Sequence, residues 1–427
     1  MSSGAETSTP AVSRQERFRA FMRRFNPTAP PDYYVEQDLT VEPPSSDIKK
    51  MAVRADLEPG SQQLLVGGIG SGKSTQLLLI ERHLSKQPKT IPFYVDVTRE
   101  TDIAKLNSGA VLASIGLHLL RYLETVAAAP TLDSVRDRVL KFALGETKEI
   151  WVPEDDYPPY DDDYPPNEHN PPFDEDDREP GRYIVRKMPG KLHPPSPLFP
   201  ALSRDLEKIE EPFRELLAAI GGEGVTLVVI VDGLDRLPSP VKFWDVVYQD
   251  LRVLRRLKIS VLASAPLSVA FGSDRPISDY VDSIHHLPVF DPRVSSFPMQ
   301  VLEKRNAAEL MDENSMEAVA RGSGGVLRDL ISLARNSATE SYLAGEETIN
   351  ERHVAKAVQE LGESYFLGLG ESHLKLLSRL KRGEGFRVEE PASLELLFTR
   401  RVLEYQEPKP RYEIHPALEG LLDETDR

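Results

Sequence analysis

The sequence predicts an α/β fold, in which helices cover a five-stranded parallel sheet and are followed by a helical lid and a small C-terminal domain. Short runs rich in β-branched residues alternate with longer segments whose apolar residues recur every three or four positions. This alternation is typical of parallel strands connected by helices. After Pro292 the pattern becomes helical, and the chain ends in helices and a short hairpin pattern.

The core is expected at residues 61–292. Its strands are expected at 62–66, 91–97, 225–231, 259–264 and 283–289, and its helices at 73–86, 103–126, 203–220 and 241–257. Each expected strand is a short β-rich run, and the runs alternate with longer helical segments. Five such strands are sufficient for one α/β domain.

The lid is expected at 293–365, with helices at 298–310, 312–321, 326–345 and 350–361. Residues 366–427 show helical patterns at 371–381 and 392–401, two short strands around the turn EPKP, and a terminal helix. Helices closed by a hairpin predict a winged helix at this end.

Residues 1–60 precede the core. The first 13 are small and polar, which predicts a disordered tail. Residues 14–25 carry five arginines among apolar residues with helical spacing, which predicts a basic amphipathic helix. It either packs on the core with its arginines in solvent or contacts nucleic acid or a partner. The Pro-rich stretch that follows, up to Gly60, is expected to be extended.

Residues 153–200 hold 13 of the 35 prolines of the chain. Within them, the segment from Glu154 to Glu179 contains twelve acidic residues and one Arg, and so contributes −11 to the formal net charge of −16. Such a composition buries too little apolar surface to offset its ordering entropy. The segment is therefore expected to be an unstructured acidic insert. It is either a partner-docking or DNA-mimicking arm or a solvated segment with no target.

Composition excludes several classes of site. The 427 residues include no cysteine, which excludes disulfides and thiolate metal sites. No apolar run reaches the roughly 18 residues that a membrane span needs, and the N-terminal residues lack the apolar segment of a secretory signal. A soluble, cytoplasmic chain without a membrane partner is expected. His285 and His286 fall within a strand and are interpreted as core or edge residues.

One glycine-rich segment carries the chemistry. Residues 66–75, VGGIGSGKST, match the pattern G-x-x-x-x-G-K-S/T between an apolar strand and an apolar helix. Backbone N–H groups and the helix N-terminus can then converge on phosphate oxygens, Lys73 supplies positive charge to the terminal phosphates, and Ser74 can ligate Mg²⁺. The expected cofactors are ATP and Mg²⁺. The expected binding residues are Gly67, Gly68, Gly70, Ser71, Gly72, Lys73, Ser74 and Thr75.

A second segment supplies carboxylates. In VTLVVIVDGLD (225–235), Asp232 ends an apolar run, and ligands of open α/β sheets lie at the carboxyl ends of the strands. Asp232 is therefore expected to join Ser74 in the Mg²⁺ shell. Asp235 is expected to orient or activate the attacking water. The alternative for Asp235 is an N-cap of the helix that starts near Pro240.

Together, GGIGSGKST and VVIVDGLDRL resemble AAA+ and STAND-type ATPases, the group that holds origin-recognition-like ATPases, NACHT proteins and the KAP family. The DGLD form is most similar to the NACHT and KAP proteins, whereas most AAA+ proteins have an Asp-Glu pair. The absence of a Glu beside Asp232 implies slow hydrolysis and a switch rather than a continuous motor.

The resemblance implies three further catalytic residues. Ser264 ends the fourth strand, where such families place a residue that senses the γ-phosphate; an ordinary strand-end serine is equally compatible. Arg275 matches an arginine finger that reaches a neighbouring subunit, or else it is solvated. Arg328, in RGSGGVLRDLISLARNS, is similar to the sensor-two arginine that faces the phosphates, or else it is a helix-surface residue.

Two functions fit these features. The first is a nucleotide-controlled ATPase that forms homo-oligomers and engages DNA through the winged helix. The second is a regulatory ATPase scaffold that controls a partner effector protein in a bacterial antiphage defence system without binding DNA. Under the first function, phosphate contacts are expected from Lys381, Arg382, Arg400, Arg401 and Lys409.

Other nucleotide enzymes fit less well. A metabolite kinase closes a small lid over a second substrate, whereas here a helical domain and a winged helix follow the core. Guanine specificity lacks support because no N-K-x-D segment follows the fourth strand.

Overall fold

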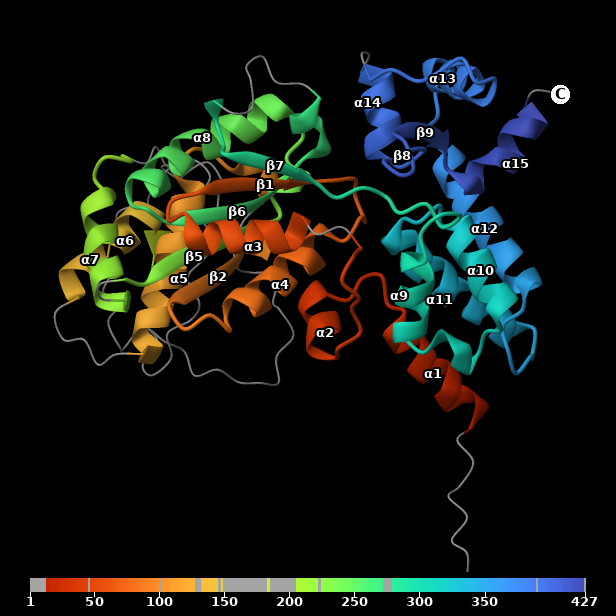
Figure 1. The fold of residues 1–427 in the computed structure, drawn as a ribbon, viewed down its shortest axis with the longest axis horizontal. Helices are drawn as coiled ribbons and strands as arrows, with labels where there is room; N and C mark the ends of the chain where they lie inside the picture. The colour runs from red at the N-terminus through yellow and green to blue at the C-terminus, as the bar shows by residue number, and fades with distance from the viewer. Residues whose placement is uncertain are drawn as a thin grey trace, which may run out of the picture. The chain divides into compact units, whose positions relative to one another are not determined.

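The described part of the computed structural model comprises residues 13–44, 47–99, 102–126, 132–144, 147–148, 183–184, 205–221, 224–271, 279–388 and 391–425. The chain forms two compact units. The first contains Met1–Arg54, Gln63–Lys86 and Leu262–Arg427, and the second contains Ala55–Gln62 and Gln87–Val261. Figure 1 shows the course of the chain with its helices and strands labelled.

The predicted five-stranded parallel sheet is confirmed. Its strand order is β2-β5-β6-β1-β7. The bounds are Gln62–Val66 for β1, Thr90–Asp96 for β2, Thr226–Asp232 for β5, Ser260–Ala265 for β6 and Ser283–His286 for β7. β7 ends three residues earlier than predicted, although the N–H of Leu287 still donates to the carbonyl of Val66 over 2.8 Å. Pro288 has no N–H with which to continue the ladder.

The helices of the second unit are α5 (Ala110–Val126), α6 (Asp133–Leu144), α7 (Glu210–Gly221) and α8 (Pro240–Arg256). Short 3₁₀ turns lie at Val97–Arg99, Ile103–Lys105 and Leu234–Arg236. The single helix predicted at 103–126 is therefore divided into a turn and α5. The buried carboxylate of Asp250 on α8 accepts hydrogen bonds from the N–H groups of Gly109 and Leu112, over 2.6 and 3.1 Å, and so caps α5.

The first unit contains the helices α1 (Arg14–Arg24), α2 (Pro31–Glu36) and α4 (Lys73–Leu84), and α3 (Asp47–Leu57) begins in it. The prediction of an extended stretch before Gly60 is wrong, because α2 and α3 lie in it. Pro31 is compatible with a helix at the first position of α2, where a missing N–H costs nothing. The predicted basic helix is present as α1, which packs on α11 of the lid.

The lid forms a helical bundle of α9 (Phe297–Lys304), α10 (Glu313–Gly322), α11 (Leu327–Leu343) and α12 (Glu351–Phe366), with a 3₁₀ turn at Ala307–Glu309 (Figure 1). All four predicted helices are present, although the first is shorter than expected. Asp312 caps α10 by accepting from the N–H of Ser315, and Asn350 caps α12. These caps explain where the two helices begin.

The C-terminal module, residues 366–425, contains α13 (Glu371–Lys381), α14 (Pro391–Phe398), β8 (Val402–Tyr405), β9 (Arg411–Ile414) and α15 (Pro416–Thr425). β8 and β9 pair antiparallel, as the predicted hairpin requires. Its core includes Leu377, Leu396, Val402 and Leu418. α14 ends three residues earlier than predicted, because Arg400 adopts a left-handed backbone conformation with φ of 64°.

The acidic insert predicted at 153–200 lies outside the described residues except at Tyr183–Ile184. These two residues form β4, which pairs in parallel with β3 at Thr147–Lys148. Among the described residues, no helix is both long enough and apolar enough to cross a membrane.

Candidate nucleotide-binding site

The glycine-rich segment forms a turn between β1 and α4. Gly70 and Gly72 have φ of 81° and 97°, which side chains rarely tolerate. A β-carbon on Gly67 would lie 2.7 Å from the carbonyl oxygen of Leu287, so the chain also needs glycine there for space. The turn therefore requires glycine at three of its positions, and α4 begins directly after it at Lys73.

Lys73 closes this turn. Its buried ammonium donates to the carbonyl oxygens of Gly67 and Gly68, over 2.9 and 3.0 Å. These bonds hold a positive charge against the backbone of the turn. An ammonium in this place attracts phosphate groups as a compact point charge.

Other groups in the turn suit an anion. Ser71 Oγ is buried, and among the described residues it has no hydrogen-bond partner. No heavy atom lies within 4 Å of a β-carbon placed on Gly68, so there is space at that residue. Ser74 and Thr75 lie in the first turn of α4, where free N–H groups and the helix dipole favour negative charge. The residues present therefore fit the phosphates of a nucleotide.

The lid contributes the start of α11 to this turn. The N–H of Arg328 donates to the carbonyl of Gly70 over 3.3 Å. A β-carbon on Gly70 would lie 2.8 Å from Cβ of Arg328, and one on Gly72 would lie 2.9 Å from Leu327 Cδ1. The structure thus brings the predicted residue Arg328 to the glycine-rich turn, with its side chain exposed.

The predicted carboxylates lie in the second unit. Asp232 is 4% exposed at the end of β5. Its Oδ1 accepts from the N–H of Gly233 over 2.8 Å, and its Oδ2 accepts from the hydroxyl of Tyr94 over 2.6 Å. Burial, together with the Asp232 carboxylate, raises the pKa of Tyr94 far above its usual value, which keeps this hydroxyl protonated as a donor. Asp232 is thus held in one orientation.

Asp235 lies in the 3₁₀ turn Leu234–Arg236 and is half-buried. The alternative interpretation of Asp235 as the cap of the next helix is wrong. Ser239 caps α8, because its side chain accepts from the N–H of Lys242 over 3.2 Å.

Of the two remaining predicted residues, Ser264 and Arg275, the structure describes only Ser264. Ser264 is fully buried in β6, and its Oγ has no hydrogen-bond partner among the described residues. A buried hydroxyl without a partner is unfavourable unless a ligand or water completes it. Arg275 lies outside the described residues.

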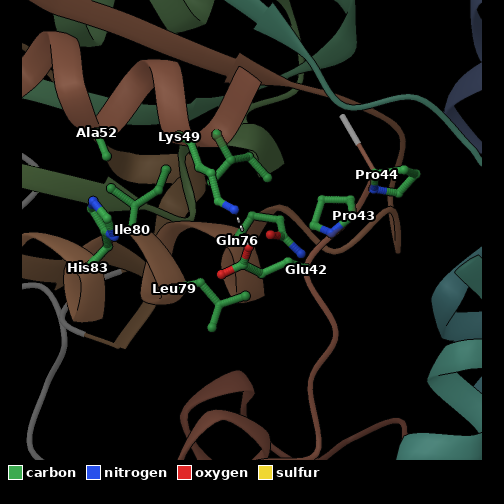
Figure 2. Close-up of a pocket in the computed structure, with 10 residues that line it drawn as sticks. Glu42, Pro43, Pro44, Lys49, Ala52, Gln76, Leu79, Ile80 and His83 are labelled. Carbon is green, nitrogen blue, oxygen red and sulfur yellow. Dashed lines mark ion pairs between the residues drawn. The ribbon is translucent and has the colours of Figure 1, made fainter. Parts of the chain in front are cut away.

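A small cavity of about 120 Å³ lies between α3, α4 and the chain before α3 (Figure 2). Its lining residues are Glu42, Pro43, Pro44, Ile48, Lys49, Ala52, Gln76, Leu79, Ile80 and His83. Gln76 is buried, and its Oε1 has no partner among the described residues. Lys49 and Glu42 form an ion pair beside it, with 3.0 Å between Nζ and Oε2. The cavity is mainly apolar with one unsatisfied acceptor.

The basic residues expected to contact DNA are engaged within the chain. Lys381 pairs with Asp423 and Arg382 with Glu384. Arg401 donates to the carbonyls of Tyr365 and Leu367, over 2.6 Å in each case. Arg400 pairs with Asp329. These four side chains have partners within the chain, and Lys409 is exposed.

No protein-family model and no curated protein matches the sequence. Among solved structures, the chain is similar to a chain of Drosophila ORC bound to DNA, with 12% identity, a TM-score of 0.44, and coverage of 100% of this chain and 96% of that chain. It is similar to Cdc6p from Pyrobaculum aerophilum, with 13% identity, a TM-score of 0.42, and coverage of 95% and 98%. A Walker-type ATPase of Pyrococcus abyssi has 12% identity, a TM-score of 0.44, and coverage of 89% and 95%. The similarity describes the fold alone.

Three residues of the site carried no motif in the sequence. Tyr94 stands opposite Ile230 in the register of β2 and β5, and it reaches Asp232 only because these strands are adjacent. Gln76 lies three residues after Lys73, hence on the same side of α4. Arg400 meets Gly70 only through the tertiary fold. Of these three residues, Gln76 could have been noticed in the sequence, because it is a polar residue beside the apolar residues of α4.

Proposed function

We propose that this chain binds ATP with Mg²⁺ and hydrolyses it slowly, as an AAA+/STAND-type ATPase that acts as a nucleotide-controlled switch. The observation that carries the proposal is the glycine-rich turn, in which Lys73 donates to the carbonyls of Gly67 and Gly68 while the lid residue Arg328 donates to Gly70. This arrangement joins a phosphate-binding turn to a helical lid. A ligand in the turn would thereby act on the lid.

The catalytic assignments follow from residue type and place. Lys73 and the first turn of α4 hold the phosphates, and Ser74 and Asp232 share the magnesium ion, Asp232 through water. Asp235 orients the attacking water, Ser264 hydrogen-bonds to the terminal phosphate, and Arg328 contacts it from the lid. Arg275 serves as an arginine finger in a neighbouring subunit of a homo-oligomer.

The base is assigned to adenine. The unsatisfied Oε1 of Gln76 is an acceptor in a mainly apolar cavity, and the amino group of adenine is a matching donor. Gln76 and Lys73 lie one helical turn apart on α4, so one ligand can extend from the turn to this side of the helix.

A switch needs ATP and ADP to interact differently with two conformations. Arg328 provides such a difference if it contacts only the terminal phosphate. The residue that follows Asp232 in the chain is Gly233, where most AAA+ proteins have the glutamate of an Asp-Glu pair, and slow hydrolysis is proposed on this ground. Slow hydrolysis gives a long-lived ATP state.

The partner of the switch is a protein in this proposal. Lys381 and Arg382 of the C-terminal module, interpreted as a winged helix, already pair with carboxylates. Releasing them for a phosphate backbone would break these pairs. This favours the regulatory scaffold that controls a separate effector over the DNA-binding ATPase.

Isothermal titration calorimetry tests the nucleotide assignment. ATP titrated with Mg²⁺ into the purified chain should bind at one site, and Lys73→Ala should lower the affinity at least about tenfold, because the charge-assisted contacts to the phosphates are lost. Lys86→Ala, two residues after the end of α4, is the matched control and should bind like the parent. Equal affinities of the parent and Lys73→Ala would refute the assignment.

A further inference from the structure

Arg400 belongs to the C-terminal module, yet its side chain reaches the glycine-rich turn. A β-carbon placed on Gly70 would lie 3.3 Å from Nη1 of Arg400 and 2.8 Å from Cβ of Arg328. One residue of the turn therefore lies against two arginines, one from the lid and one from the module that follows the lid. The sequence motifs account only for Arg328.

The backbone of Arg400 is held in an unusual conformation. Its φ of 64° lies in the left-handed region, where glycine is the usual residue. Its N–H donates to the carbonyl of Leu397 over 3.1 Å as α14 ends. Non-glycine residues persist in this region when the surroundings determine the conformation, and such residues cluster at functional sites. An arginine occupies this position although glycine would fit the backbone better.

The guanidinium has one anionic partner and spare donors. Nη1 donates to Oδ1 of Asp329 over 2.7 Å, and the guanidinium carbon lies 5.4 Å from the centroid of the Tyr365 ring. An arginine side chain carries five N–H donors. With the described residues, this is the one hydrogen bond that the Arg400 side chain forms. Most of its donors thus remain for an anion.

Asp329 is fixed from its other side. Its Oδ2 accepts from the hydroxyl of Tyr365 over 2.6 Å, and Nε2 of His415 lies 3.4 Å from the same oxygen. Nδ1 of His415 accepts from the N–H of Ala417 over 3.2 Å, while Nε2 is buried and forms no hydrogen bond with the described residues. Residues of α12 and of the module therefore anchor the carboxylate that Arg400 meets.

We propose that Arg400 is a second nucleotide-sensing arginine, which leaves Asp329 in part to bind the terminal phosphate of a triphosphate held in the glycine-rich turn. This inference rests on the proposed ATP site. An oxyanion at the turn competes with the Asp329 carboxylate for one guanidinium. The module that carries Arg400 then has different contacts with ATP and with ADP, which is what a nucleotide switch requires.

Two substitutions test this with effects of opposite sign. Arg400→Ala should lower the affinity for a non-hydrolysable ATP analogue about tenfold or more, because a charge-assisted contact is lost, while the affinity for ADP changes less than about threefold. Asp329→Asn should raise the affinity for the analogue, because the guanidinium no longer has an anionic competitor. Binding is measured by calorimetry with Mg²⁺ on the full chain, and thermal unfolding is measured without nucleotide.

Arg379→Ala is the matched control, because Arg379 is an exposed arginine on α13 of the same module, paired with Glu384 at 3.5 Å. It should bind both nucleotides like the parent. An unchanged affinity of Arg400→Ala for the ATP analogue would overturn the inference. Equal losses of affinity for the analogue and for ADP, together with a lower unfolding temperature, would also overturn it. If Arg400→Ala does not fold, unchanged or weaker analogue binding by Asp329→Asn decides against it. A parent chain that binds no nucleotide would instead refute the proposed ATP site.

Discussion

The carboxylate of Asp232 receives one hydrogen bond on each oxygen, from the N–H of Gly233 and the hydroxyl of Tyr94. Each carboxylate oxygen accepts more than one hydrogen bond, so both oxygens keep capacity for a water that is bound to a metal ion. Such outer partners orient metal ligands, and their loss weakens metal binding. Tyr94 is thus a positioning residue for the proposed magnesium site.

Tyr94→Phe removes the 2.6 Å hydrogen bond and leaves Oδ2 of Asp232 buried with one donor fewer. The free energy of unfolding should fall by about 1–3 kcal/mol. The Mg²⁺ concentration for half-maximal ATP turnover should rise severalfold, because the carboxylate loses its fixed orientation. Urea unfolding and a magnesium titration of phosphate release measure the two effects.

Tyr122→Phe is the control for that experiment. Tyr122 lies on α5 with its ring 5.0 Å from that of Phe93, and its hydroxyl has no hydrogen bond with the described residues. Loss of this hydroxyl should change neither quantity. A Tyr94→Phe protein with unaltered magnesium dependence would show that Tyr94 contributes to stability alone.

At the scale of elements, the turn before α11 determines where the lid meets the glycine-rich turn. Gly324 and Gly325 have φ of 57° and 83°, and a β-carbon on Gly325 would lie 1.9 Å from the carbonyl oxygen of Phe290. The hydroxyl of Tyr405 on β8 donates to the carbonyl of Gly324 over 2.8 Å. The turn is therefore packed against two other segments of the first unit, and α11 starts from a fixed place.

The substitutions Gly325→Ala and Gly345→Ala distinguish the loss of stability caused by steric overlap from the loss caused by backbone strain. Gly345 also has a positive φ, of 77°, but a β-carbon there meets no heavy atom within 4 Å. Gly345→Ala should cost only about 1 kcal/mol of stability. Gly325→Ala should cost more than about 2 kcal/mol, because the new methyl group overlaps a backbone carbonyl as well. Thermal unfolding of both variants measures the difference, and equal losses would contradict the packing described for this turn.

At the scale of the whole molecule, the charge distribution bears on the partner. The chain has a formal net charge of −16, and the paired basic residues Lys381 and Arg382 leave the C-terminal module few free cations. Binding of DNA through its backbone uses several Lys or Arg contacts to phosphates and depends steeply on salt. We base the proposal of a protein partner in part on this distribution.

Native gel shifts with duplex DNA test this on the full chain and on a variant that lacks residues 153–200. Binding through multiple phosphate contacts loses roughly a thousandfold in affinity between 50 and 200 mM salt. Neither protein should show DNA binding with this salt dependence. A salt-dependent shift of both would support the DNA-binding alternative. A shift of the deletion variant alone would identify the acidic insert as a DNA mimic that covers a basic surface.

The parts of the fold that depend on local pattern were predictable. All five strands and the helices α4 and α8 lie close to the predicted ranges, because apolar residues recur with a different period in strands and in helices. The helices α5 and α7 begin at Ala110 and Glu210, seven residues after their predicted starts. The glycine-rich turn was predictable because its chemistry is contiguous in sequence. α2, α3 and α6 were not predicted, since proline and charged residues obscure short helices whose stability comes from packing.

The sequence by itself determined the sheet, the glycine-rich turn and the acidic strand end, because each is encoded by neighbouring residues. Only the tertiary structure assigned the hydroxyl of Tyr94 to Asp232 and placed Arg400 beside Gly70 and Asp329. Arg400 is separated along the chain from Asp329 by 71 positions and from Gly70 by 330, so these residues meet only through long-range packing. The sequence gives the type of a residue but does not show whether its side chain lies in solvent or in an ion pair. The sequence alone therefore predicts Arg400 only as a DNA contact, whereas the structure also shows its contacts with Gly70 and Asp329.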